Sequence, residues 1–340
     1  MTFLEITADN ITKCADRLKS GGLVTMPTET VYGLGADATN DHAVAAIFAA
    51  KGRPQFNPVI VHYMEAKQAE EDVLFTPQAK TLAALYWPGP LTMILSRRES
   101  SRLSLLTSAG LPTQAVRVPA HPVARQLIKA LGRPIAAPSA NSSGTLSPTT
   151  PQHVWDSLGE KAGFILAGGK CAVGLESTVI DMTGDIPTLL RPGAVTPEEI
   201  EMALGCSIKI ETEAVNDAPK SPGQLLRHYA PRTPLRLKAV DLKKGEALLG
   251  FGNLKFMGIE GGGFAKNLPS EMCLNLSEQG DLTEAAANLF AMLHRLDTGG
   301  YSGIAVMAVP NVGLGRAIND RLTRASSAQA VAISGARQPA

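Results

Sequence analysis

Side chains that could bind a charged substrate stand at several points where predicted strands and helices end. The segment 27–34, PTETVYGL, follows the apolar run 23–26 and brings two hydroxyls, a carboxylate and a phenol together. Ligands of open α/β sheets gather where strands end, so this cluster suits a binding site. The same residues also suit a plain turn that is capped by a threonine.

Two cations and an amide follow at the end of a predicted helix. Lys51 and Arg53 lie in the segment KGRP, and Asn57 precedes a predicted buried strand that ends in His62. Lysine offers a compact charge and arginine a fork of donors, so this corner suits a polyphosphate. The alternatives are a basic corner that only faces water and, for His62, a hydrogen-bonded core histidine.

Further junctions carry the same residue types. Arg117 lies inside the apolar strand 115–118, where a guanidinium needs a partner such as a carboxylate or a phosphate. The other junctions end in hydroxyl, amide or guanidinium side chains: Ser139 and Asn141 after the strand 135–137, Ser177 before the strand 178–182, and Arg191 on a predicted turn. Together they predict one anion-binding cleft.

Two glycine-rich segments resemble nucleotide motifs but fit them poorly. The segment 33–38 matches G-x-G-x-x-A, yet a dinucleotide site needs an acidic residue about 20 positions later, where this chain has Lys51 and Arg53. Close backbone packing explains these glycines better. The segment 163–170 differs from a P-loop in spacing by one residue, and Cys171 replaces the required Ser or Thr.

Composition excludes several classes of protein. A net charge of +1 predicts no tight non-specific binding to nucleic acid, although a local basic patch remains compatible with it. No apolar run approaches the roughly 20 residues that cross a bilayer, and the first residues lack the core of a signal peptide. The four cysteines lie far apart without a C-x-x-C pair, so we expect free thiols and a cytoplasmic location.

The hydrophobic pattern predicts two α/β domains joined by a linker. Short β-rich runs alternate with amphipathic helical segments up to residue 207, which predicts a twisted open mixed sheet. Residues 208–233 are polar and turn-prone, so we interpret them as the linker. The segment 234–340 starts with strand-like runs and continues with long helices, which predicts a second, smaller, Rossmann-like domain.

These motifs resemble those of a known family. PTETVYGLG, KGRP followed by NP, the S-x-N of residues 139–141, and EST followed by RPG occur in the same order as in the YrdC-type domain of threonylcarbamoyl-AMP synthases. This resemblance covers residues 7–205. The segment SPGQLLRHYAPRTPL and the residues after it resemble the long form of the family, which adds a C-terminal domain.

The resemblance implies a role for individual residues. Threonine would contact four side chains and one stretch of backbone: Thr30, His62, Arg117, Ser177 and Ala137. ATP would contact Lys51, Arg53, Asn57, Thr113, Ser139, Asn141, Ser147, Arg191 and Tyr229, with Tyr229 folding over the nucleotide from the linker. Lys51 and Arg53 would also stabilise charge in the reaction, with Mg²⁺ arriving on ATP and no metal held by the protein.

The implied reaction fits these residue types. Threonine's amine would capture bicarbonate, and the resulting carbamate would attack the α-phosphate and release pyrophosphate, so positioning and charge stabilisation suffice. We see no Ser-His-Asp or Cys-His arrangement that would predict a covalent intermediate. We interpret Asp181 as structural and Glu29 as a group that orients a cation or a water.

Two other functions remain in view. One is a YrdC-like module that handles a carbamoyl-adenylate in a maturation system, although the further maturation domains are missing. The other is a non-enzymatic RNA-binding or ribosome-associated factor, which the low aromatic content of 5% disfavours. For the enzyme, we expect the product to pass to a downstream tRNA threonylcarbamoyl transferase, and direct tRNA binding stays open.

Overall fold

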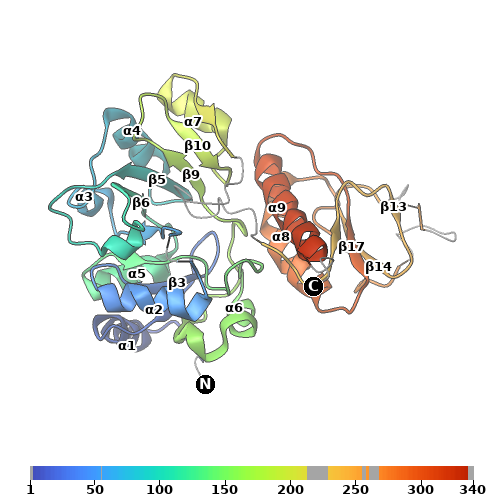
Figure 1. The fold of residues 1–340 in the computed structure, drawn as a ribbon, viewed down its shortest axis with the longest axis horizontal. Coiled ribbons are helices and arrows are strands. Elements are labelled where there is room, and N and C mark those ends of the chain that lie inside the picture. Colours follow the sequence, from blue (N-terminus) through green and yellow to red (C-terminus); the bar gives the residue numbers. More distant parts are fainter. Residues whose placement is uncertain (1–2, 55, 213–228, 255–257, 260–267, 336–340) are drawn as a thin grey trace. The chain divides into compact units, whose positions relative to one another are not determined.

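The computed structural model describes residues 3–54, 56–212, 229–254, 258–259 and 268–335, and the chain divides into two compact units (Figure 1). The first unit comprises residues 1–143 and 147–225, and the second comprises 144–146 and 226–340. The predicted boundaries at 207 and 233 stay predictions, because most of the proposed linker lies in 213–228, outside the described residues.

A mixed sheet forms the centre of the first unit, as the sequence predicts. In the described residues its order is β1-β8-β2-β3-β7-β4-β6-β5-β9-β10-β11, with parallel and antiparallel neighbours. Its strands are β1 (Phe3–Leu4), β2 (Val24–Met26), β3 (Gly33–Asp37), β4 (Val61–His62), β5 (Leu91–Ser96), β6 (Thr113–Arg117), β7 (Ile135–Ala136), β8 (Phe164–Leu166), β9 (Thr178–Asp181), β10 (Thr188–Arg191) and β11 (Lys209–Ile210).

Helices of this unit begin and end where the sequence signals them. Asn40 caps the start of α2 by accepting the Ala43 N–H at 3.2 Å, and Gly52 ends that helix in the left-handed region at φ 59°. The helices are α1 (Ala8–Lys19), α2 (Asp41–Lys51), α3 (Ala66–Ala69), α4 (Pro77–Tyr86), α5 (Pro122–Leu131), α6 (Pro151–Leu158) and α7 (Pro197–Leu204).

Apolar side chains of the first unit form separate buried clusters on the sheet. The largest joins α2, α4 and α7 to strand residues such as Val61 and Val116. A second joins α1 and α5 to residues of β2, β7 and β8. A third, smaller cluster consists of strand residues and their neighbours alone: Ile60, Ile94, Ala115, Val179 and Leu190. This third cluster lies beside the polar residues described below.

The second unit contains a parallel sheet, which confirms the Rossmann-like prediction. Its order is β12-β17-β14-β16, and every neighbouring pair is parallel. These strands are β12 (Leu235–Arg236), β14 (Glu246–Gly250), β16 (Cys273–Asn275) and β17 (Gly303–Val306); β13 (Asp241–Leu242) pairs separately with β15 (Gly258–Ile259). Helices α8 (Leu282–Asp297) and α9 (Leu314–Gly335) also belong to the described part of this unit, with α9 in red in Figure 1.

Some details differ from the sequence-based expectations. Arg191 is the last residue of β10 and not part of a turn, because β10 pairs with β9 up to this position and the turn-forming Pro192 comes only afterwards. Helix α7 was not expected, although its capping box of Thr196 and Glu199 is a clear start signal. None of the helices in the described residues is long and apolar enough to cross a membrane.

Candidate threonine and nucleotide site

Strand register places three polar side chains on one face of the first unit's sheet. His62 on β4 lies beside Arg117 on the parallel strand β6. Thr92 lies opposite Arg117, one step from the Met93–Val116 pair of β5 and β6. Directly paired residues project to the same face, so the three side chains share it. This face is also that of Ile60, Ile94 and Ala115, two residues away along each strand.

Arg117 is buried and fixed by three contacts. Its Nε donates to the Gly89 carbonyl at 3.0 Å, one terminal nitrogen donates to Thr30 Oγ1 at 3.0 Å, and the other forms an ion pair with Glu29. The prediction that this arginine needs an anionic partner is confirmed, and the partner is Glu29. A guanidinium has five N–H donors. Two therefore remain available, one on each terminal nitrogen, among the described residues.

Glu29 is held in its charged form by these contacts. Burial raises the pKa of this carboxyl, but the charge and hydrogen bond of Arg117 and the backbone N–H groups of Glu29 and Ala120 outweigh burial and lower the pKa below its ordinary value. The Ala120 N–H donates to its second oxygen at 3.1 Å. Glu29 thus positions Arg117, which refines the expectation that it orients a cation.

Thr30 is oriented by the turn that contains it. Thr28 Oγ1 lies 2.8 Å from Thr30 Oγ1 and accepts the N–H groups of Thr30 and Val31, each at 3.2 Å. The interpretation as a turn capped by a threonine is therefore confirmed, and this turn presents Thr30 to Arg117. Ligand binding by this segment stays a prediction.

His62 has an unused ring nitrogen in a dry environment. Its Nδ1 is buried without a hydrogen-bond partner in the described part of the chain. Burial, and then the charge of Arg117, lower its pKa to about 3, so the imidazole is neutral at pH 7. A buried polar atom without a partner costs free energy unless a ligand or water satisfies it. Nδ1 is therefore available to a ligand or to a water, and the threonine contact of His62 stays a prediction.

Residues expected to bind the nucleotide lie toward the other end of the same strands. Strand β7 runs antiparallel to β4, with Ile135 beside His62, and the Ala137 N–H donates to the Ile60 carbonyl at 2.9 Å. The chain continues in this direction to Ser139, which bridges to Gly33. Ala137 thus lies between His62 at one end and Ser139 at the other.

Arg53 and Asn57 form a joined pair at this second end. Arg53 donates to Asn57 Oδ1 at 2.6 Å, to the Asn57 carbonyl at 3.2 Å and to the Pro58 carbonyl at 2.7 Å. Asn57 Nδ2 is buried without a partner in the residues that the structure describes. Thr113 begins β6 while Arg117 ends it, so parallel pairing with β4 brings Thr113 to the Pro58 end.

Lys51 ties helix α2 to the loop after β7. Its ammonium is buried and donates to the carbonyls of Ser139, at 2.5 Å, and Asn141. Burial, and then the charge of Arg53, lower its pKa well below the ordinary value. The structure thus shows Lys51 holding the loop that carries two other predicted nucleotide residues, and a contact with phosphate stays a prediction.

Ser177 and Arg191 contact each other beside Thr92, at the Arg117 end of this face. Arg191 Nε donates to the Ser177 carbonyl at 3.0 Å, and a terminal nitrogen donates to Ser177 Oγ at 3.1 Å. Thr92 Oγ1 lies 2.7 Å from the same Ser177 hydroxyl. Ser147 is linked to this group of residues, because its hydroxyl donates to Glu176, which directly precedes Ser177 in the sequence.

Thr92 and the Gly89 carbonyl were not expected in this arrangement, and Glu176 was noted as part of the EST motif without a role of its own. Thr92 carried a signal, since it is the polar member of the buried run 91–95 and points to the Arg117 face. Glu176 is the first residue of the EST motif, but its partner Ser147 is distant in sequence, and the Gly89 carbonyl carried no signal because Arg117 is likewise distant.

Other predicted residues lie outside this cluster of contacts or have structural roles. Tyr229 belongs to the second unit, where its fully buried ring packs 5.7 Å from the ring of Phe290. Asp181 accepts the N–H and hydroxyl of Thr183, which confirms its structural interpretation. No group of three or more His, Cys, Asp and Glu in the described residues could hold a metal ion, and all four cysteines are free.

Comparison with known proteins identifies the family. Residues 16–193 match the Sua5-YciO-YrdC family model, described as "telomere recombination", and residues 195–327 match the threonylcarbamoyl-AMP synthase C-terminal domain. The threonylcarbamoyl-AMP synthase of Pyrococcus abyssi is 40% identical over 93% of this chain and 94% of its own. The chain belongs to the threonylcarbamoyl-AMP synthase family.

Further similarities agree with this membership. The threonylcarbamoyl-AMP synthase of Bacillus subtilis is 38% identical over 94% of both chains. The crystal structure of P. abyssi Sua5 complexed with L-threonine superposes with a TM-score of 0.85 at 35% identity and covers 97% of this chain and 98% of that one. The two-domain long form expected from the sequence is therefore the form of this family member.

Proposed function

We propose that this protein is an L-threonylcarbamoyladenylate synthase, which converts L-threonine, bicarbonate and ATP into threonylcarbamoyl-AMP and pyrophosphate. One observation carries the proposal. Residues suited to an amino acid, around Arg117 and His62, and residues suited to a nucleotide, around Arg53 and Asn57, lie at opposite ends of paired strands, with Ala137 between them. The threonine bound to the P. abyssi relative supports the choice of amino acid.

The threonine end can recognise a carboxylate and a hydroxyl. The two remaining N–H donors of Arg117 suit the two oxygens of the substrate carboxylate, a pairing that is strong when buried. Thr30 offers a hydroxyl oxygen that can accept, because its own proton goes to Thr28 Oγ1. Ser177 offers a second hydroxyl, and neutral His62 offers Nδ1. Glu29 and Gly89 hold Arg117 in place, so little order has to be gained on binding.

The chemistry then needs positioning more than a reactive side chain. The threonine nitrogen bonds to the carbon of bicarbonate and water leaves, which forms a carbamate. A carbamate oxygen bonds to the α-phosphorus of ATP, and the bond to the pyrophosphate oxygen breaks. Threonine held beside Arg117 and ATP held beside Arg53, with Ala137 between them, would bring the carbamate and the α-phosphate together. Arg53 would offer positive charge to the phosphates, and Arg191, which contacts Ser177, would offer it from the side of the threonine.

We propose that Mg²⁺ enters as part of the nucleotide substrate. The cationic and amide groups of the nucleotide end suit phosphate oxygens, and the ion would neutralise charge on the phosphates.

The remaining proposals follow from the product. Threonylcarbamoyl-AMP would feed the threonylcarbamoyladenosine modification of tRNAs that read ANN codons, through a downstream tRNA threonylcarbamoyl transferase, and we place this step in the cytoplasm.

Pyrophosphate release tests the activity. The purified protein should release pyrophosphate only when ATP, threonine and bicarbonate are all present. Equal turnover with serine in place of threonine, or no turnover with any amino acid, would contradict the proposal.

A matched pair of variants tests the carboxylate assignment. Arg117→Lys should raise KM for threonine by about tenfold to a hundredfold, because lysine cannot make the same paired hydrogen bonds. Arg133→Lys is the control, since Arg133 also pairs with a buried carboxylate, that of Asp37, but belongs to neither end of the site. An unchanged KM in Arg117→Lys would remove this residue from the substrate contacts.

A further inference from the structure

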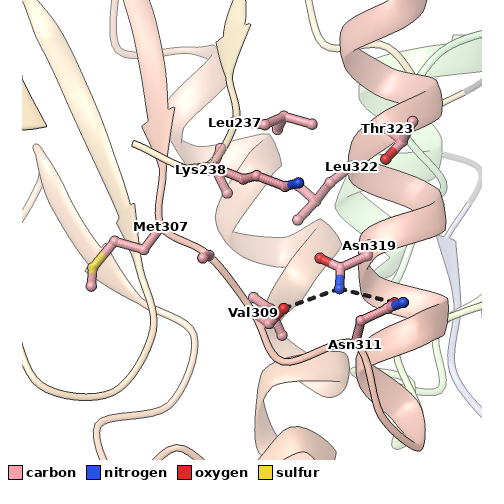
Figure 2. Close-up of a pocket in the computed structure, with 10 residues that line it drawn as sticks. Leu237, Lys238, Met307, Val309, Asn311, Asn319, Leu322 and Thr323 are labelled. Carbon is pink, nitrogen blue, oxygen red and sulfur yellow. Dashed lines mark hydrogen bonds between the residues drawn. The ribbon is translucent and has the colours of Figure 1, made fainter. Parts of the chain in front are cut away.

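A pocket of about 460 Å³ lies within the second unit, at the carboxyl ends of its parallel strands (Figure 2). Its walls come from residues just after β12, from the end of β17 and the loop beyond it, and from one side of α9. Ligands of open parallel sheets bind in this position, and the volume is that of small-molecule sites in general. No contact with the first unit is needed to form it.

The pocket combines an apolar wall with one positive charge. Val306, Val309 and Leu322 are buried aliphatic residues that line it. Figure 2 shows the side chain of Lys238 extended from the end of β12 toward α9, across the pocket. None of the ten lining residues that the structure describes is acidic. The lining therefore favours an anion that carries an apolar or planar body.

Two amides in the lining are arranged to read a hydrogen-bonding edge. The Asn319 amide nitrogen donates to the Val309 carbonyl at 3.1 Å and to Asn311 Oδ1 at 3.4 Å. The same contacts, drawn as dashed lines in Figure 2, leave the Asn319 oxygen as an acceptor and the Asn311 nitrogen as a donor. An acceptor next to a donor is the pattern that asparagine uses on adenine.

Backbone conformation at Lys238 agrees with a functional role. Lys238 has φ +53°, in the left-handed region that lysine rarely adopts. Such a conformation persists where the surroundings demand it, often at ligand sites. Here it directs the one cation among the described lining residues toward the pocket.

We propose that this pocket binds a nucleoside monophosphate. The planar base would lie against the aliphatic wall with its edge on the two asparagines, and the phosphate would reach Lys238. A single cation suits a single phosphate, whereas a triphosphate would need more charge than this lining offers. A free amino acid would leave most of the volume to water. This inference does not rest on the catalytic activity proposed above.

Calorimetric titration of the full chain with AMP tests the proposal. Lys238→Asn should weaken AMP binding at least tenfold without harming the fold, because asparagine tolerates a positive φ. Ala308→Phe should do the same by filling the pocket from an exposed lining position. Lys238→Arg should retain binding, and the exposed Lys243→Asn, outside the lining, should leave it unchanged.

AMP can also enter the proposed catalytic nucleotide site, so Arg53→Gln is titrated in parallel. The binding that Lys238→Asn removes should persist in Arg53→Gln, and adenosine or inorganic phosphate alone should bind at least tenfold more weakly than AMP. The proposal is overturned if AMP binding is unchanged in both pocket variants, if all binding disappears with Arg53→Gln, or if adenosine binds as tightly as AMP.

Discussion

At the residue scale, the candidate site contains buried polar groups that lack some of their hydrogen-bond partners. Arg117 uses three of its N–H donors in contacts with Gly89, Thr30 and Glu29, and its other two donors have no partner among the described residues. His62 Nδ1 and Asn57 Nδ2 have no partner in the described residues. Such groups cost about 1–3 kcal/mol each when buried, so a substrate that paired with them, as the proposed function requires, would recover this free energy.

The histidine predicts a pH dependence of stability. His62 has a folded pKa of about 3 and an ordinary value of 6.5, so between these pH values the unfolded chain binds a proton that the folded chain does not. The contribution of neutral His62 to the free energy of unfolding is therefore complete above pH 6.5. It declines by about 1.4 kcal/mol per pH unit as the pH falls toward 3. Urea unfolding at pH 7, 6, 5 and 4 should show a flatter dependence for His62→Gln than for the parent.

The exposed His42 provides a control for this measurement. His42→Gln should follow the parent's dependence on pH. If His62→Gln shows the same slope as the parent, the buried neutral state of His62 is contradicted.

At the scale of elements, the sheet needs glycine where β3 passes between its neighbours. A Cβ on Gly35 would lie 2.9 Å from Ile135 Cγ2 and 3.1 Å from the Val24 carbonyl. The glycines of segment 33–38 therefore permit close strand packing, as the sequence analysis interpreted them. This close packing of β2, β3 and β7 accompanies the bridge between Gly33 and Ser139.

Gly35→Ala should lower the free energy of unfolding by about 1–3 kcal/mol, because the added methyl group overpacks the sheet. Gly184→Ala is the matched control, since its Cβ would meet only the Ile186 carbonyl, at 3.9 Å, and its φ is not positive. Urea unfolding of both variants measures the difference. Equal stability of Gly35→Ala and the parent would refute the packing explanation.

At the scale of the whole molecule, the second unit has a core of its own into which Tyr229 is built. Its ring is fully buried against Phe290, and the Arg321 guanidinium lies 5.3 Å from the ring centre. Tyr229 is also the residue expected to cover the nucleotide. The part of the proposed linker between 213 and 228 lies outside the described residues, so the structure leaves that expectation as a prediction.

Two variants of Tyr229 separate these roles. Tyr229→Ala should destabilise the second unit by about 3–5 kcal/mol, because a buried ring is lost, whereas Tyr229→Phe keeps the ring and most of the stability. Calorimetric unfolding measures this effect.

As a lid, Tyr229 should also lower KM for ATP, so Tyr229→Ala and truncation after residue 207 should both weaken activity. Full activity in both would remove the lid hypothesis.

The sequence by itself determined the mixed α/β class, most helices and strands, and the residue types of the site. Gly52 and the capping residues act within a few positions of chain, and alternation of apolar residues is also local, so these features can be predicted. Tertiary structure alone decided which groups meet. Glu29 reaches Arg117, Lys51 reaches the carbonyls of Ser139 and Asn141, and Glu176 reaches Ser147, although the partners lie far apart in sequence. Strand order and register set these pairs, and no local pattern encodes them.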